Sequence, residues 1–265
     1  AVDPTGTVDI DDYTELLKKG PALVSIMSVN NEIGSVQDID MLGGMAQEAG
    51  AKFHSDITQG VGKCRLDLVA RPVDYATLSG HKFHAPKGIG VLWARDCSPL
   101  KPFMVGGTHE NYRRAGTHNV PLIVGMGQAA KLILRDGEAE AKRMRRMRDD
   151  IIARVLAEVP DSRVNGQGNG APHIISLSFL RTEGEPIIIN LDALGICCTA
   201  GAACSSGKHV SSPVLTAIGL PEEWLRGTVR VSLSRFTTEE ECDLLVDSLV
   251  NSVRSVRNIS GYANV

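Results

Sequence analysis

Residues 79–88 read SGHKFHAPKG, and this stretch places a lysine between two short apolar segments. Residues 75–78 before it and 90–94 after it have the length and apolar character of strands. A lysine at such a strand-to-strand connection, with a histidine beside it, is well placed to form a Schiff base with an aldehyde cofactor. The alternative is that Lys82 is an ordinary solvated lysine on the surface.

A second segment, HSDITQ at residues 54–59, favours the first interpretation. The cofactor pyridoxal 5'-phosphate (PLP) needs an acid facing its ring nitrogen, a donor at its ring oxygen and several donors around its phosphate. Asp56 would supply the acid and Gln59 the donor at the ring oxygen, whereas Ser79 and His81 would supply phosphate donors. Asp56 taken alone would be a helix cap or a turn residue.

Six separate stretches resemble the NifS/IscS-type cysteine desulfurases of the class-V aminotransferase family. They are VNNEIG (29–34), HSDITQ (54–59), SGHK (79–82), RAGT (114–117), GAAC (201–204) and VRVSLSRFTT (229–238). The resemblance implies an α/β fold of the PLP-dependent, aspartate aminotransferase-like type. It also implies a large domain with a mainly parallel sheet and a small α+β C-terminal domain.

The resemblance assigns three catalytic residues: Lys82, its neighbour His81, and Cys204, whose thiol would form a persulfide. Cys204 lies in a stretch of small residues, which is typical of a loop, and an exposed thiol near cations favours the nucleophilic thiolate. Taken alone, Cys204 would more often be a buried structural thiol. Cys197 and Cys198 precede it. Adjacent cysteines are poor ligands for one tetrahedral metal ion, and no fourth ligand follows at a usual interval, so the two residues are expected in a strand and not in a metal site.

Three further residues are assigned by resemblance. Arg230 lies in an apolar strand, where a charge needs a partner; its fork would bind the substrate carboxylate, and a salt bridge at a strand end is the alternative. Asn31 resembles a residue beside the cofactor ring oxygen and the substrate carboxylate. Thr117 resembles one that reaches the cofactor phosphate of a neighbouring subunit, which implies a homodimer.

The activity implied by the resemblance is conversion of L-cysteine to L-alanine, with the sulfur passed to an acceptor or scaffold protein for iron–sulfur clusters or other sulfur compounds. A selenocysteine lyase shares these motifs, and a non-catalytic fragment that dimerises or binds a partner is the second alternative. Members of the family begin with a phosphate loop and a ring-stacking histidine, which are not found before residues 29–34. The sequence is therefore expected to lack the N-terminal part.

Composition narrows the classes of partner. The net charge of −3 and the aromatic content of 4% argue against a nucleic-acid partner. The longest apolar runs are far shorter than the roughly 18 residues of a membrane helix. Six cysteines without framework spacing indicate reduced thiols, and hence the cytoplasm, or an organelle if a targeting segment precedes the chain.

The pattern of apolar residues predicts domains over 1–137 and 138–265, with Gly137 as a break in a long helix or helix pair. The basic stretch 142–148 within it indicates a solvated face, with an acidic partner surface as the alternative. A capping box is predicted at Thr237 and Glu240. Strands are predicted over 22–29, 51–55, 75–79, 90–94, 173–179, 195–198 and 228–233. Helices are predicted over 38–48, 122–159, 185–194 and 212–218, with a last helix whose apolar stripe runs from 242 to 256.

Overall fold

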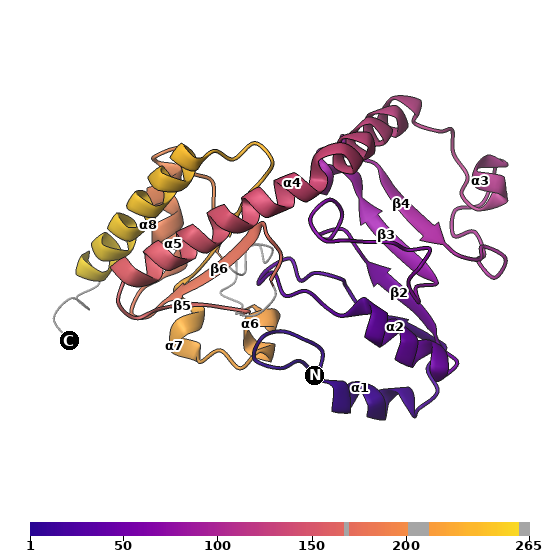
Figure 1. Ribbon diagram of the computed structural model, residues 1–265, viewed down its shortest axis with the longest axis horizontal. Helices are drawn as coiled ribbons and strands as arrows, with labels where there is room; N and C mark the ends of the chain where they lie inside the picture. The colour runs from indigo at the N-terminus through magenta and orange to yellow at the C-terminus, as the bar shows by residue number, and fades with distance from the viewer. Residues whose placement is uncertain (167–169, 201–211, 260–265) are drawn as a thin grey trace. The chain divides into compact units, whose positions relative to one another are not determined.

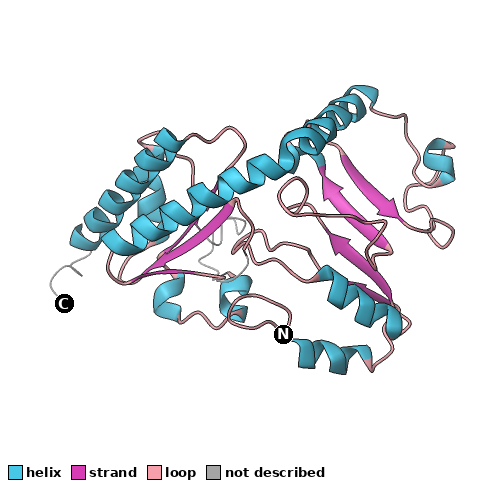
Figure 2. Cartoon of the chain, viewed as in Figure 1, coloured by secondary structure: helices cyan, strands magenta, loops and turns pink. Residues whose placement is uncertain are grey.

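The protein is described by a computed structural model that covers residues 1–166, 170–200 and 212–259 (Figure 1). Figure 2 shows helices and strands along the whole of these ranges. The strands are β1 Leu23–Ser25, β2 Lys52–Asp56, β3 Tyr75–Ser79, β4 Gly90–Ala94, β5 Ser162–Val164, β6 Ile174–Phe179, β7 Thr199–Ala200 and β8 Thr228–Ser232. The helices are α1 Ile10–Leu17, α2 Ile39–Glu48, the 3₁₀ helix η1 Gly80–Phe83, α3 His109–Tyr112, α4 Val120–Glu158, α5 Gly184–Asp192, α6 Pro213–Ala217, α7 Glu222–Leu225 and α8 Glu239–Ile259.

The chain divides into two compact units. The parallel-sheet unit comprises Thr14–Val29 and Asp38–Glu138, and the antiparallel-sheet unit comprises Ala1–Tyr13, Asn30–Gln37 and Ala139–Val265. The last change between units lies between residues 138 and 139, and the predicted domain limit lies between 137 and 138. The two short segments 1–13 and 30–37 pack with the C-terminal half of the chain.

The parallel-sheet unit contains a four-stranded sheet in the order β1-β2-β3-β4. The first three strands are parallel and β4 is antiparallel to β3, which confirms the predicted α/β layer with a mainly parallel sheet. β3 and β4 have the predicted bounds. β1 is shorter than the predicted strand 22–29, although the N–H groups of Ile26 and Ser28 still donate to carbonyls of β2.

Helix α2 covers this sheet because its apolar residues share one face. Asp38 caps it by accepting a hydrogen bond from the N–H of Met41, which satisfies one of the free donors of the first turn. Gly43 lies so close to the loop before β3 that an added Cβ would lie 2.3 Å from the Pro72 carbonyl oxygen. The buried face consists of Ile39, Leu42, Gly43 and Ala46.

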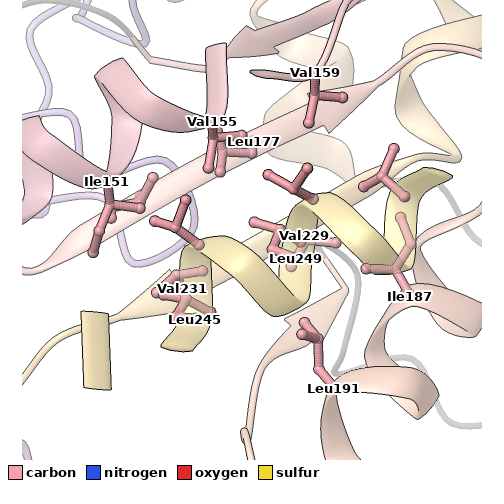
Figure 3. Close-up of a cluster of buried hydrophobic side chains, with 14 of the residues drawn as sticks. Ile151, Val155, Val159, Leu177, Ile187, Leu191, Val229, Val231, Leu245 and Leu249 are labelled. Atoms are coloured by element: carbon pink, nitrogen blue, oxygen red, sulfur yellow. The ribbon is translucent and has the colours of Figure 1, made fainter. Parts of the chain in front are cut away.

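The antiparallel-sheet unit has its own sheet, in the order β5-β6-β8-β7. Every residue of β6 is buried, because α4, α5 and α8 contribute side chains to the same core. Figure 3 shows this cluster, in which Val155 of α4 lies near Leu177 of β6 and Leu249 of α8 lies near Val229 of β8. Truncating a fully buried leucine such as Leu249 to alanine would cost about 2–5 kcal/mol.

Helix α8 confirms the predicted apolar stripe and corrects the predicted cap. Every member of the stripe is buried: Cys242, Leu245, Val246, Leu249, Val250, Val253 and Val256. The capping box is formed one residue later than predicted, by Thr238 and Glu241. The Thr238 N–H donates to the Glu241 carboxylate at 2.9 Å, and the Glu241 N–H donates to the Thr238 hydroxyl at 3.2 Å.

Helix α4 is a single helix of 39 residues, so the predicted break at Gly137 is wrong. Its basic stretch is not a purely solvated face. Arg143 donates to the backbone carbonyls of Ser234, Arg235 and Thr237, and Arg148 donates to those of Gly170 and Ala171. The arginines therefore hold loops of the same unit to the helix.

The predicted strand 195–198 is also wrong. Residues 196–198 have no regular structure, and the paired residues are Thr199 and Ala200, opposite Arg230 and Val229 of β8. Among the residues that the structure describes, no helix is both long enough and apolar enough to cross a bilayer.

Candidate functional site

The predicted site residues belong to both units. Asp56, Gln59, Ser79, His81, Lys82 and Thr117 lie in the parallel-sheet unit, and Asn31 and Arg230 lie in the antiparallel-sheet unit. Cys204 lies outside the described residues. Each group is described within its own unit.

Asp56 is the last residue of β2, at the carboxyl end of a parallel strand, where ligands of such sheets bind. Its Oδ1 accepts a hydrogen bond from the N–H of Thr58 at 2.8 Å, which fixes the turn that follows the strand. The residue is exposed, and Oδ2 has no hydrogen-bond partner among the described residues. One carboxylate oxygen is thus held by the chain and the other is open to a ligand.

Lys82 lies in η1, directly after the neighbouring parallel strand β3. It is exposed, and its amine makes no hydrogen bond or ion pair with the part of the chain that the structure describes. The short helix is tightly built, because a Cβ added at Gly80 would lie 3.0 Å from the Ile89 side chain and 3.1 Å from the Ala85 Cβ. The predicted position of Lys82 at a strand-to-strand connection is confirmed.

Ser79 and His81 stand on either side of Gly80 and contact each other. The Ser79 hydroxyl lies 2.8 Å from Nδ1 of His81, so each fixes the rotamer of the other. His81 is exposed, and Ser79 ends β3. A hydroxyl and an imidazole paired at the carboxyl end of a strand are donors of the kind that bind phosphate.

These residues fit PLP by the chemistry of their side chains. An amine, an open carboxylate oxygen and a hydroxyl–imidazole pair occupy the carboxyl ends of two adjacent parallel strands. Gln59 lies in the turn that follows β2. Lys82 would hold the aldehyde carbon, Asp56 the protonated ring nitrogen, and Ser79 and His81 the phosphate.

A residue that the sequence analysis did not single out, Lys63, contacts this site. Its Nζ donates a hydrogen bond to the backbone carbonyl of Lys82 at 2.7 Å. Burial lowers the pKa of Lys63 to about 8; the charge of Lys82 adds to the lowering and Cys64 opposes it. No local pattern could have identified Lys63, because the contact joins two turns that follow different strands.

In the antiparallel-sheet unit, Arg230 and Asn31 are brought together. Nη1 of Arg230 donates to the backbone carbonyl of Asn31 at 3.0 Å. Asn30 holds the turn that carries Asn31, because its side-chain oxygen accepts from the N–H groups of Glu32 and Ile33. Asn31 itself is exposed.

The other edge of the Arg230 guanidinium, Nε with Nη2, makes no hydrogen bond to the described residues. Nε is buried without a partner, which is costly unless a ligand supplies an acceptor. No ion pair joins Arg230 to an acidic residue in the described ranges, so the alternative of a salt bridge at a strand end is not seen there. This edge has the geometry that binds a carboxylate with two parallel hydrogen bonds.

Thr117 lies in an exposed loop between α3 and α4. Its hydroxyl makes no hydrogen bond with the residues that the structure describes, so its proposed role toward a second subunit stays a prediction.

Of the cysteine pair before β7, Cys198 packs against the core of the unit and Cys197 is exposed. Burial raises the pKa of Cys198 to about 11, with a further rise from Cys197. Cys198 is thus an unreactive structural thiol at neutral pH. Among the described residues, no three His, Cys, Asp or Glu side chains form a group suited to a metal ion.

Comparison with known proteins gives one family. The sequence matches the class-V aminotransferase family over residues 1–245. A cysteine desulfurase of Nostoc sp. strain PCC 7120 is 42% identical over 265 residues, covering 100% of this chain and 66% of the relative. The cysteine desulfurase NifS of Azotobacter vinelandii is 40% identical over 262 residues, covering 98% of this chain and 65% of the relative.

A solved structure described as a NifS-like protein superimposes with a TM-score of 0.87 at 29% identity, covering 96% of this chain and 67% of that one. The chain thus spans 66% of the length of the first of these relatives. These relatives do not support either of the two alternatives, which are a selenocysteine lyase and a non-catalytic fragment. The match over most of the chain, with the fold that accompanies it, confirms the resemblance seen in the sequence: the chain belongs to the class-V aminotransferase family, whose cysteine desulfurases depend on PLP.

Proposed function

We propose that this chain carries the cofactor and substrate residues of a PLP-dependent cysteine desulfurase. In the reaction, the C–S bond of L-cysteine breaks and an S–S bond forms to the Cys204 sulfur. The products are L-alanine and an enzyme persulfide, so no external oxidant or reductant is needed. The observation that carries the proposal is that the amine of Lys82 and one carboxylate oxygen of Asp56, each without a hydrogen-bond partner among the described residues, lie at the carboxyl ends of two adjacent parallel strands, β3 and β2.

When bound, PLP supplies an electron sink for negative charge at the substrate Cα. Lys82 would hold the aldehyde carbon in the resting enzyme, and its Nζ would serve as the base for the proton on the substrate Cα. Asp56 would keep a proton on the ring nitrogen. Ser79 and His81 would anchor the phosphate, Gln59 would donate to the ring oxygen, and His81 would assist proton transfer.

The substrate carboxylate is assigned to the Nε–Nη2 edge of Arg230, with Asn31 beside it. Two parallel charge-assisted hydrogen bonds would fix both the position and the orientation of the amino acid. The buried Nε of Arg230 would gain the acceptor it lacks. Cys204, on the matched GAAC segment at 201–204, is the proposed acceptor of the sulfur.

The relatives named as cysteine desulfurases support this reaction and L-cysteine as the substrate. We extend the proposal to a homodimer in which Thr117 reaches the cofactor phosphate of the second subunit. A sulfur-acceptor or scaffold protein for iron–sulfur cluster assembly would receive the persulfide sulfur. The described cysteines form no disulfide with one another, which suits a reducing compartment, for which we propose the cytoplasm.

Borohydride trapping in the full-length protein tests the proposal. PLP and borohydride should label Lys82, as mapped by peptide mass spectrometry, and L-cysteine should yield L-alanine. Lys82→Ala should abolish both results, whereas Lys87→Ala, at an exposed lysine of the same loop, should change neither. Cys204→Ala should retain the label and lose the persulfide. A wild-type protein without label at Lys82, or persulfide that persists in Cys204→Ala, would refute the respective assignment.

A further inference from the structure

The turn after β2 fixes the position of Lys63. The N–H groups of Lys63 and Cys64 both donate to the Gly60 carbonyl, at 3.0 and 2.8 Å. Gly62 adopts the left-handed conformation with φ +72°, and a Cβ added there would lie 3.0 Å from the Ile133 side chain of α4. The backbone directly before Lys63 is thus held against a helix of the same unit.

The backbone carbonyl of Lys82 needs a donor that η1 does not supply. The N–H groups of His84 and Ala85 both donate to the Gly80 carbonyl. Position 86, four residues after Lys82, is a proline and has no N–H. The ammonium of Lys63 supplies the donor, at 2.7 Å and from 19 residues earlier in the chain. The end of η1 that carries the reactive amine is thus bonded to the turn that follows β2.

We infer that Lys63 is a positioning residue, which fixes the backbone of Lys82 and thereby the direction in which the reactive amine leaves η1. The inference rests on the proposed attachment of PLP to Lys82. It adds that the two turns following β2 and β3 act as one support for the cofactor. Asp56 lies at the base of one turn and Lys82 in the other, so a bond between the turns maintains the spacing of acid and amine.

The charge of Lys63 determines the strength of this bond. A hydrogen bond from an ammonium group is stronger than one from a neutral amine. Because burial lowers the pKa of Lys63 to about 8, a rise in pH from 7 to 9 removes the charge. A purely space-filling role for the side chain would show no such dependence on pH.

The first test needs no cofactor and uses hydrogen exchange in the full-length protein. Lys63→Met should speed exchange of the amides in residues 80–88 by about tenfold, the expected effect of losing a hydrogen bond to a charged group. Lys63→Arg retains a charged donor and should exchange within about twofold of wild type. Lys87→Met, a matched exposed lysine in the same loop, should not alter the exchange outside position 87. Equal exchange in wild type and Lys63→Met would overturn the inference, whatever the fate of the proposed function.

The second test measures the rate at which PLP is trapped on Lys82 by borohydride. Lys63→Met should slow trapping about tenfold, and Lys63→Arg should restore it. The ratio of the wild-type rate to the Lys63→Arg rate should be constant below pH 7 and fall between pH 7 and 9, because arginine keeps its charge. A ratio that stays flat over this range would overturn the inference even if Lys63→Met folds poorly. A wild-type protein that traps no PLP at Lys82 would refute the proposed function, while the exchange experiment would still decide the bond between the turns.

Discussion

Replacing Arg230 by glutamine tests the substrate half of the site. Nη1 of Arg230 is already bonded to the Asn31 carbonyl, so the Nε–Nη2 edge is the part left for a carboxylate. Hydrogen bonds to charged groups contribute about 1.5–3 kcal/mol each. If water recovers part of the two lost bonds, the net loss is about 3 kcal/mol, which corresponds to about a hundredfold in kcat/KM for L-cysteine.

The loss should appear mainly as a higher KM, because the carboxylate is bound in the ground state as well as in the transition state. Arg230→Lys keeps the positive charge but not the pair of parallel N–H donors, so a loss of about tenfold in kcat/KM is expected. The assay is alanine release at several cysteine concentrations. Arg226→Gln, at an exposed arginine of the same unit, is the matched control and should keep wild-type kinetics.

Stability provides an independent check on the same variant. Arg230→Gln removes a buried Nε that lacks an acceptor but also the Nη1 bond to the Asn31 carbonyl, and these two effects oppose each other. The free energy of unfolding in urea should therefore change by no more than about 1.5 kcal/mol. The carboxylate assignment is wrong if Arg230→Gln stays folded and its kcat/KM remains within about threefold of wild type. It is also wrong if Arg226→Gln loses as much.

Three other predictions concern the fold that supports the site. Thr238→Ala removes one half of the capping box of α8 and should lower the free energy of unfolding by about 1 kcal/mol, measured by urea titration, whereas an unchanged midpoint would contradict the cap. Gly43→Ala should cost about 1–3 kcal/mol, since its Cβ would lie 2.3 Å from the Pro72 carbonyl oxygen; Gly44→Ala, with open space around its Cβ, is the control and should be neutral or stabilising. Burial lowers the pKa of His54, which bridges Ser25 and Thr77, so the unfolded state binds a proton more readily than the folded state. The free energy of unfolding should therefore fall as the pH is lowered through about 6.5, and a His54→Asn variant should show a smaller fall between pH 7.5 and 5.5.

The sequence was sufficient to predict the helices and strands whose run of apolar residues ends abruptly at both ends. β3 and β4 have the predicted bounds, because polar or glycine-containing turns border each run. The stripe of α8 is buried at every predicted position, since a period of 3.6 residues over 21 residues leaves little ambiguity.

The errors arise where a tertiary partner decides the outcome. The edge strand β7 lies at Thr199–Ala200 rather than at 195–198, because its pairing is determined by β8. The cap of α8 uses the second of two adjacent threonines, and both threonines have a glutamate three residues later. In each case the local sequence offers two nearly equivalent choices.

The site was predicted in the same uneven way. The pattern alone predicts Asn31, Asp56 and Lys82 just past the ends of three strands. The structure confirms a strand end for Asp56 and Lys82, whereas β1 ends at Ser25, well before Asn31. Their roles toward a cofactor remain predictions. Lys63 could not be found, because the bond it makes to Lys82 depends on how two turns pack and not on the residues adjacent to it in the sequence.

The arginines of α4 have a consequence for association studies in vitro. Arg143 and Arg148 donate partly to uncharged main-chain oxygens and partly to carboxylates of their own helix, Glu140 and Asp149, so their positive charges are matched within the unit. An excess of positive charge counted along 142–148 thus overstates how strongly this helix would attract polyanions or an anionic resin.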